Sequence, residues 1–260
     1  MSSSDSTLDQ TLQQVVSCYR SGVATQPFFN PDLGEAGAYR VQYRLIERLQ
    51  EQGQIIAGHK VALTSKAARS HLGIDEPCFG HILDQGVHAN DSDVPVGDFA
   101  DPHAEAEIAF LFGEDLKGPG VTPVHVISAT RAVLPAIELV DLKVQGEGIQ
   151  AVDVIAHNAL HGGVVVGSRL NPLGDLDLQF EGVTVEHNGT LHGSGTGSEV
   201  MGNPINPIVW LANKLAEFDD YLKAGEIVIS GSMVTPVRVK PGDYIKVTYT
   251  RLGSVGARFI

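Results

Sequence analysis

Cysteine is scarce in this sequence of 260 residues, which contains only Cys18 and Cys78. The two residues lie far apart and form no CxxC pair, so the sequence indicates neither a disulfide framework nor a cysteine-ligated zinc site. Few cysteines without a disulfide pattern are typical of a reducing compartment, and we predict a cytoplasmic location.

Basic residues are also few, because 18 Lys and Arg stand against 31 Asp and Glu, which gives a formal net charge of -13. Such a surface repels nucleic-acid phosphates and anionic lipid, so we expect no nucleic-acid partner. No stretch approaches the roughly 20 apolar residues of a membrane span. The first residues, MSSSDSTLDQTLQQ, carry neither the basic nor the apolar segment of a signal peptide. We therefore expect no membrane partner.

Motifs for nucleophilic or nucleotide chemistry are missing as well. There is no GxSxG elbow and no Cys/His pair that would indicate a nucleophile. The run from Gly193 to Ser198 is rich in glycine but lacks GK[ST], so we interpret it as a permissive loop close to a ligand. The ten histidines are scattered without metal-ligand spacing, and we expect most of them at the surface or in loops.

What is present is a globular balance of 43% hydrophobic and 19% charged residues. Helical spacing predicts a helical N-terminal part over residues 1–54, and short apolar runs between turns predict a β-rich catalytic body over residues 55–260, an α+β fold. Asn188-Gly189 predicts a two-residue hairpin turn. We expect helices at Leu8–Val23, Glu35–Gln52, Pro123–Val133 and Pro207–Tyr221, and strands at Ile55–Leu63, Glu105–Phe112, Ala136–Asp141, Gly162–Val166, Thr184–His187, Ile227–Ser230, Tyr244–Tyr249 and Val255–Phe259.

The sharpest chemical signal is a group of acidic residues in strand-like segments. Glu105 and Glu107 stand two apart as an apolar strand begins, so both carboxylates point to one side. Glu138 lies inside the apolar run PAIELVD, where an unpaired acid would be costly to bury. A solvated strand face would explain the first pair, and a salt bridge would explain Glu138. A hard cation, Mg²⁺ or Mn²⁺, would explain all three, because such ions favour carboxylate oxygens.

Lys60 stands in a second apolar strand, directly after Gly58 and His59. Desolvation there would lower the pKa of the lysine and suit it to proton transfer, or it would serve as a fixed cation beside a bound anion. A snorkelling lysine at a strand edge is the structural alternative.

The run Ser230-Gly-Ser follows another apolar strand, and we predict that His59, Ser230 and Ser232 bind the substrate.

The chain carries, in this order, the motifs GHKVALTSKAA, HAEAEIAFLF, LPAIELVD, WLANKL, LKAGEIVISGS and GSVGARFI. Together these motifs resemble the 2-oxopent-4-enoate hydratases and 4-oxalocrotonate decarboxylases of the fumarylacetoacetate hydrolase superfamily. The resemblance runs from about the second helix to the last residue. It implies a mixed β-roll with a helical N-terminal part, a homo-oligomer, and an association with a homologous decarboxylase or hydratase.

The resemblance also implies a site and a reaction. Glu105, Glu107 and Glu138 match the metal-ligand glutamates of that family, and Lys60 matches its active-site lysine. Substrates of the family are small 2-oxo acids or their dienols, the 2-hydroxy-2,4-dienoates of aromatic catabolism. Mg²⁺ or Mn²⁺ would stabilise an enolate, and water would then add at C4 to give a 4-hydroxy-2-oxo acid.

This chain departs from the pattern of the family at three points. Cys78 replaces the aspartate of a PDFG segment, Lys143 replaces an arginine after the third glutamate, and His157 begins a segment that usually reads Asp-Asn-Ala-Ser. If the missing aspartate handles water or protons, Asp75, Glu76 or His157 would have to replace it. We assign Asp75, with Lys60, to the predicted catalytic residues.

Hydration is the predicted reaction, because the run at Ser230–Ser232 is closer to the hydratases than to decarboxylases with a TGG pattern. A decarboxylase of a 2-oxo dioic acid is the main alternative. An acylpyruvate C–C hydrolase would need a His/Glu pair before Ile55, and the sequence has none there. A catalytically inactive subunit that partners an active homologue is the remaining alternative.

Overall fold

A computed structural model describes residues 3–28 and 33–260 of the chain. The helices are α1 (Ser3–Ser21), α2 (Gly34–Glu51), α3 (Lys66–Leu72), α4 (Pro123–Ala129), α5 (Ala151–Ala156) and α6 (Ile205–Leu215). The strands are β1 (Ile56–Ala62), β2 (Cys78–Leu83), β3 (Val87–Ala89), β4 (Ser92–Val94), β5 (Pro102–Phe112), β6 (Thr130–Asp141), β7 (His161–Val166), β8 (Gly182–His187), β9 (Thr190–Thr196), β10 (Ile227–Ile229), β11 (Val237–Arg238), β12 (Tyr244–Tyr249) and β13 (Ser254–Phe259).

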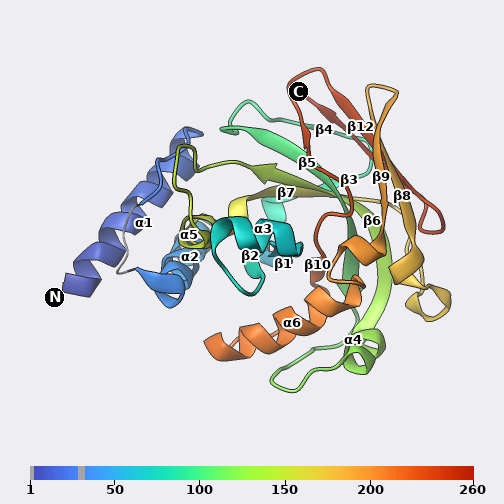
Figure 1. The fold of residues 1–260 in the computed structure, drawn as a ribbon, viewed down its shortest axis with the longest axis horizontal. Helices are drawn as coiled ribbons and strands as arrows, with labels where there is room; N and C mark the ends of the chain where they lie inside the picture. The colour runs from blue at the N-terminus through green and yellow to red at the C-terminus, as the bar shows by residue number, and fades with distance from the viewer. Residues whose placement is uncertain (1–2, 29–32) are drawn as a thin grey trace.

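The N-terminal helices α1 and α2 pack at one side of the molecule, beside the sheets (Figure 1). Apolar residues recur along one face of α2, so the helix buries Ala38, Val41 and Leu45. These side chains belong to the same hydrophobic core as Phe79 of β2 and Ile108 of β5. The helices are thus continuous with the β-rich body in packing, and the division of the chain into two parts stays a prediction.

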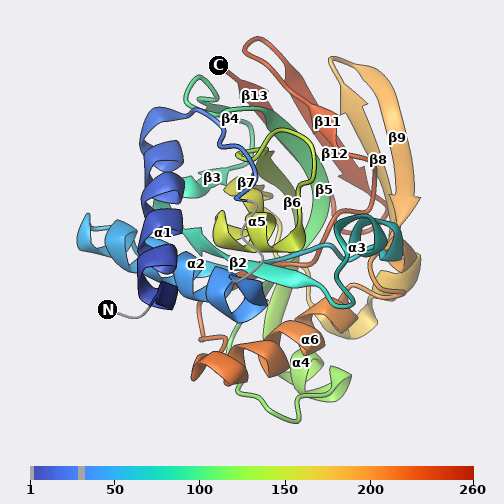
Figure 2. The same ribbon diagram turned by 60° about the vertical axis from the view of Figure 1, so that its left-hand side comes forward.

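Two curled sheets form the β-rich body within the described residues (Figure 2). The larger sheet has the order β2-β1-β10-β5-β6-β7-β3, with β11 paired to β5, and the smaller sheet has the order β4-β13-β12-β8-β9. Three of the pairings, β1 with β10, β3 with β7 and β4 with β13, are parallel, and the other pairings are antiparallel. This arrangement confirms the predicted α+β class, a mixed β-roll with a helical N-terminal part.

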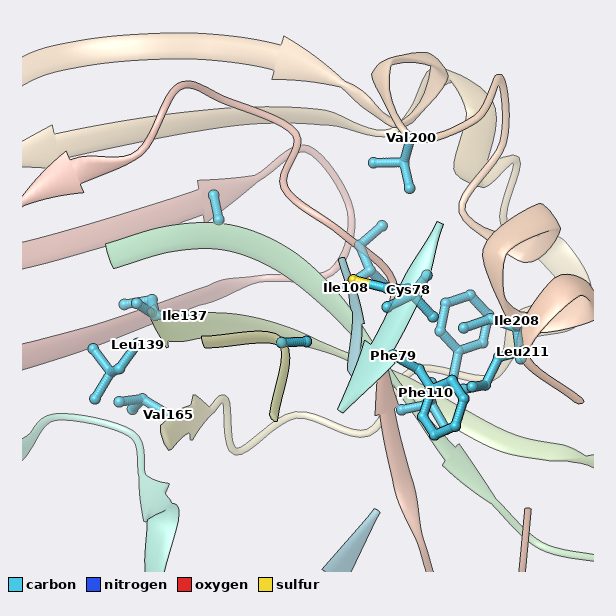
Figure 3. Close-up of a cluster of buried hydrophobic side chains, with 14 of the residues drawn as sticks. Cys78, Phe79, Ile108, Phe110, Ile137, Leu139, Val165, Val200, Ile208 and Leu211 are labelled. Atoms are coloured by element: carbon cyan, nitrogen blue, oxygen red, sulfur yellow. The ribbon is translucent and has the colours of Figure 1, made fainter. Parts of the chain in front are cut away.

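A cluster of large apolar side chains joins the larger sheet to helix α6 (Figure 3). Phe79 of β2 and Phe110 of β5 are fully buried, as are Ile208 and Leu211 on one face of α6. Their burial stabilises the protein by roughly 1.5–3 kcal/mol per side chain. In the described part of the chain, no helix is both long and apolar enough to cross a membrane.

The predicted hairpin at Asn188 and Gly189 is confirmed. These two residues join β8 to β9, and both have positive φ, 52° and 78°, as a tight hairpin turn with the sequence Asn-Gly requires. The glycine-rich run from Gly193 to Ser198 differs from its prediction as a loop, because residues 193–196 belong to strand β9 at the edge of the smaller sheet. A Cβ atom on Gly195 would lie 2.0 Å from the Met233 carbonyl oxygen, so glycine permits a close approach of two segments here.

The predicted helix Pro123–Val133 is wrong in its second half. Helix α4 ends at Ala129, and strand β6 begins at Thr130. Thr130 pairs with Phe112 and Ala132 pairs with Leu111, so these residues extend the ladder between β6 and β5. Tertiary pairing of this kind overrides helical spacing, since β-branched Thr130 and Val133 also favour a strand.

Candidate active site

A cavity of about 770 Å³ lies where the larger sheet meets the loop segments that follow β1 and β10. Strand β1 contributes Lys60, strand β5 contributes Glu105, and strand β6 contributes Glu138. The segment of residues 231–236 and residues 192–194 of β9 also line the cavity, so the glycine-rich run begins beside it, and its contact with a ligand stays a prediction. The rest of the lining is mainly apolar and includes Leu72, Val140, Leu142, Val154 and Leu160.

The antiparallel register of β5 and β6 brings three glutamates together. Glu105 pairs directly with Glu138, and Glu107 stands two residues beyond Glu105 on the same face of β5. One carboxylate oxygen of each residue lies within 4.8 Å of the others. Glu107 and Glu138 are fully buried, whereas Glu105 is half-buried. The alternative for Glu105 and Glu107, a strand face exposed to solvent, therefore does not agree with the structure.

Hydrogen bonds fix two of the three carboxylates and leave one oxygen of each without a partner. Glu138 Oε1 lies 2.6 Å from Lys60 Nζ and 2.9 Å from His161 Nδ1. Glu107 Oε2 accepts a hydrogen bond of 2.7 Å from the backbone N–H of Gly231. Glu107 Oε1 and Glu138 Oε2 are buried and have no hydrogen-bond partner among residues 3–28 and 33–260. Buried oxygens of this kind call for a ligand, because an unpaired buried carboxylate oxygen is costly.

Crowding of negative charge perturbs all three glutamates. Burial and the Glu138 charge raise the pKa of Glu105 to about 7. Burial and the other two carboxylates raise the pKa of Glu107 well above its ordinary value. Burial acts the same way on Glu138, but Lys60 and His161 outweigh it and lower the pKa of Glu138 to about 2. Without a cation, the cluster therefore retains protons that solvated glutamates would release.

A hard divalent cation fits this cluster. The donors are carboxylate oxygens, which Mg²⁺ and Mn²⁺ prefer, and two of these oxygens have no other partner. The positive charge of the ion would also remove the repulsion that raises the pKa values of Glu105 and Glu107. The structure thus brings together the three glutamates that the sequence pointed to, and their role as ligands stays a prediction.

Lys60 forms the salt bridge that was the structural alternative for Glu138, but it forms it inside the cavity lining. Burial opposes the charge of the ammonium group, yet Glu138, Glu105 and Glu107 outweigh this effect and raise the pKa of Lys60. The expectation of a lowered pKa is thus wrong for this arrangement, because three carboxylates surround the lysine. The other expectation, that Lys60 serves as a fixed cation beside a bound anion, stays a prediction.

The remaining predicted site residues are divided between the cavity and other places. Ser232 lines the cavity, while Ser230 is fully buried and outside the lining. His59 lies on the face of β1 opposite to Lys60 and outside the lining, because consecutive strand residues alternate. Asp75 is exposed in the loop between α3 and β2 and also lies outside the lining. Asp75 and His59 therefore have no contact with the cavity in this structure.

The three departures from the family pattern are buried structural positions outside the cavity lining. Burial raises the pKa of the free Cys78 thiol to about 12, which keeps it protonated and unreactive. His157 stacks on Phe28 at 5.1 Å between ring centroids and contacts the Thr25 hydroxyl at 3.1 Å. Lys143 forms a buried salt bridge of 3.1 Å to Asp141. These residues support the scaffold around the site.

Sequence reasoning missed His161, the first residue of β7, which orients Glu138. It also missed His192 and Glu199, which line the cavity and can both exchange protons. Four of the ten histidines, His59, His81, His157 and His161, are buried. The only signal for His161 was its place before the apolar run GGVVV, and register with β6 is needed to bring it to Glu138.

Replacing Gly231 by alanine should weaken Mg²⁺ binding by about tenfold, since the N–H of this residue orients Glu107. Gly231 has φ of 111°, and a Cβ atom would lie 2.5 Å from Thr64 Oγ1, so the backbone must shift. Calorimetric titration with Mg²⁺ measures the effect. The control is Gly242→Ala, which has φ of 97° but open space around the Cβ atom. Equal Mg²⁺ affinity in both variants would contradict the prediction.

Residues 57–260 match the fumarylacetoacetate (FAA) hydrolase C-terminal family. The chain is 35% identical to the 2-oxo-hept-4-ene-1,7-dioate hydratase of Escherichia coli, over 88% of each protein. It is 33% identical to the 2-keto-4-pentenoate hydratase of Paraburkholderia xenovorans strain LB400, over 96% of this chain and 94% of that protein.

A solved structure is similar over the whole chain. The 4-oxalocrotonate decarboxylase from Pseudomonas putida G7, complexed with magnesium and adipate, superposes with a TM-score of 0.93. The match covers 100% of this chain and 99% of that chain at 32% identity. Hydratases and a decarboxylase are thus similar to this chain to about the same degree in sequence.

Proposed function

The chain belongs to the fumarylacetoacetate hydrolase family, and on this premise we propose that it is a Mg²⁺- or Mn²⁺-dependent hydratase. Its substrate is a 2-hydroxy-2,4-dienoate with an uncharged tail, and its product is a 4-hydroxy-2-oxo acid. Support for hydration comes from similar proteins, since the E. coli relative is by name a hydratase of a 2-oxo-enedioate and the P. xenovorans relative is one of a 2-keto-enoate. Of these two names, the second matches an uncharged tail.

One observation carries the choice of an uncharged tail. In the part of the cavity lining that the structure describes, Lys60 is the only lysine and there is no arginine. Lys60 already neutralises Glu138 at 2.6 Å, so it is not available to a second substrate carboxylate. The apolar side chains of Val140, Leu142 and Leu160 suit a short hydrocarbon tail, whereas a carboxylate among them would lie without a partner.

Glu105, Glu107 and Glu138 would hold the cation, and no further residue of the chain is needed for that role. When bound, the cation supplies Lewis-acid stabilisation of the negative charge on the 2-oxygen and the adjacent carboxylate. Lys60 lies beside Glu138 and donates a proton to C5 of the dienol, while the 2-hydroxyl proton is transferred to the lysine as the enone forms. Water then adds across C3 and C4, with its hydroxyl group going to C4 and its proton to C3. His192 and Glu199 are the lining residues outside the glutamate cluster that can accept a proton from this water.

The decarboxylation of a 2-oxo dioic acid is the second candidate function. It is favoured by the similarity in fold over the whole chain to the 4-oxalocrotonate decarboxylase, whose structure holds the dicarboxylate adipate. Both reactions draw on the same stabilised enolate, so the glutamate cluster alone does not distinguish them. The homo-oligomeric state, an association with a homologous enzyme and the cytoplasmic location stay predictions.

Turnover of a matched substrate pair tests the proposal. With Mg²⁺, we expect 2-hydroxypenta-2,4-dienoate to gain one water, with a kcat/KM at least about tenfold higher than that of its dicarboxylate analogue, 2-hydroxymuconate. Loss of the dienol absorbance gives the rate, and mass spectrometry identifies the product. Release of CO₂ from the dicarboxylate, with no water gained by either compound, would favour the decarboxylase. No turnover of either compound would favour an inactive partner subunit.

A further inference from the structure

A second polar cluster lies on the face of β1 that points away from the cavity. Consecutive residues of a strand point to opposite faces, so Lys60 faces the glutamates and His59 points to the other side, where Tyr43 of α2 packs on the neighbouring His81. His59 pairs directly with His81 of the antiparallel strand β2, and the two imidazole centroids lie 5.0 Å apart. Asp220, in the turn between α6 and β10, completes the cluster.

The two imidazoles are buried without hydrogen bonds. His59 is 1% exposed and His81 is fully buried. None of their four ring nitrogens has a hydrogen-bond partner among the residues that the structure describes. Aromatic rings surround the pair, with Phe79 5.9 Å and Tyr43 5.0 Å from the His81 ring centroid (Figure 3 shows Phe79). Buried polar groups normally have a hydrogen-bond partner, so an apolar environment alone does not explain why two imidazoles are buried here.

Negative charge adjoins the imidazoles. One ligand atom each of His59, His81 and Asp220 lies within 4.8 Å of the other two. Glu226 is also buried, and its Oε2 lies 3.6 Å from His59 Nδ1. Two neutral imidazoles and two carboxylates together balance the charge of one divalent ion. Lys223 lies 3.9 Å from an oxygen of each carboxylate, but its half-exposed side chain can turn to solvent and give way to an ion.

We propose that His59, His81 and Asp220 form a second metal site, which binds a divalent transition-metal ion of the zinc class. Imidazole nitrogen suits Zn²⁺ and its neighbours in the first transition row, whereas Mg²⁺ prefers an all-oxygen cluster such as the three glutamates. Directly opposed residues on neighbouring strands can reach one ion, as cross-strand pairs lie close together. Asp220 is 20% exposed in its side chain, which gives an ion a route from solvent.

The second site would have a positioning role. An ion there ties β1 and β2 to the turn that leads from α6 to β10. Because His59 is the neighbour of Lys60 in β1, this link also fixes the strand that places the lysine against Glu138. The site goes beyond the proposed hydratase activity, and it uses none of the residues that the hydration requires.

Titration of the full-length protein with Co²⁺ in the presence of excess Mg²⁺ tests the proposal. Co²⁺ replaces Zn²⁺ and has visible absorption that reports nitrogen ligation, while Mg²⁺ fills the glutamate cluster. We expect one Co²⁺ per wild-type chain, and an affinity at least about tenfold weaker in Asp220→Asn. Asp219→Asn removes the same charge one residue earlier, at an exposed position with φ of 56° that asparagine tolerates, and should bind like wild type.

Two further results decide the origin of any signal. Glu107→Gln damages the glutamate cluster and should leave Co²⁺ binding to the histidines unchanged, so a lost signal in this variant would place the ion at the glutamates and overturn the proposal. Absence of Co²⁺ binding in wild type, or equal affinity in Asp220→Asn and wild type, would also overturn it. His81→Gln gives a second removal of a ligand, and a folded variant, judged by circular dichroism, should lose the signal.

Discussion

Replacing Glu107 by glutamine is expected to abolish turnover and to weaken Mg²⁺ binding by about 100-fold or more. Glu107 Oε1 is buried without a partner in the described structure, and in our proposal it faces the cation. Glutamine keeps the size of the side chain and an acceptor for the Gly231 N–H, but it removes one charge from the cluster. Loss of a ligand should exceed the roughly 10- to 100-fold loss typical of residues that only orient ligands.

The Glu107→Gln variant should weaken Mg²⁺ binding but increase the stability of the metal-free protein. Burial and the neighbouring carboxylates raise the pKa of Glu107 and, to about 7, that of Glu105. A carboxyl group whose pKa is raised on folding keeps its proton in the folded state at a pH where the unfolded chain has already released it. The free energy of unfolding therefore falls as the pH rises above the pKa of the unfolded state. The free energy of unfolding of the metal-free wild type should therefore fall as the pH rises from 4.5, the ordinary pKa of a glutamate, through about 7.

Thermal unfolding measures this linkage. At pH 7.5 (about half a unit above the raised pKa of Glu105), metal-free Glu107→Gln should unfold at a higher temperature than metal-free wild type. Mg²⁺ should raise the unfolding temperature of wild type and not of the variant, since only a bound ligand stabilises the folded state. Glu114→Gln, an exposed acid just after β5, is the matched control. Unchanged Mg²⁺ affinity with full turnover in Glu107→Gln would contradict the proposed metal site.

Replacing Lys60 by methionine should lower kcat by roughly 100- to 10,000-fold, the range that a positioned acid or base contributes. Methionine retains most of the buried chain of lysine and removes the ammonium group that contacts Glu138 at 2.6 Å. Because that ammonium group repels a cation in the same cluster, Mg²⁺ affinity should be retained or increased. The split between kcat and metal affinity distinguishes Lys60 from the glutamates.

Steady-state kinetics at saturating Mg²⁺ and a separate Mg²⁺ titration give the two quantities. Lys66→Met is the control, because Lys66 is exposed on α3 and the substitution removes the same charge outside the cavity. A parallel loss of kcat and Mg²⁺ affinity in Lys60→Met would instead indicate that the lysine only holds Glu138 in place.

The sequence predicted the members of the glutamate cluster but not how they meet. Glu105 and Glu107 were placed on one face by their spacing, and Glu138 stood out as an acid in an apolar strand. Their convergence depends on the register that sets Glu105 opposite Glu138, which no local pattern contains. His161 was missed for the same reason, because β7 joins β6 only through long-range pairing. Local spacing does not reveal which strands become neighbours.

Errors in the fold prediction also followed from pairing at long range. The residues after Ala129 had a helical pattern, but β5 offers them a ladder that starts at Thr130. Strand β2 was not predicted, since CFGHIL mixes a glycine and a histidine into a short apolar run. Asp75 was assigned to catalysis only to replace the aspartate absent at Cys78, and the structure places Asp75 in an exposed loop.

The location of the glutamates on long paired strands has a practical consequence for altering the enzyme. Strands β5 and β6 pair over almost their whole length, so changes there would disturb the sheet along with the carboxylates. The apolar lining, in contrast, comes partly from short segments such as residues 233–236 and helix α3, which contributes Ala68 and Leu72. A mutant library confined to those segments could redirect the preference for a substrate tail and leave the reaction centre untouched.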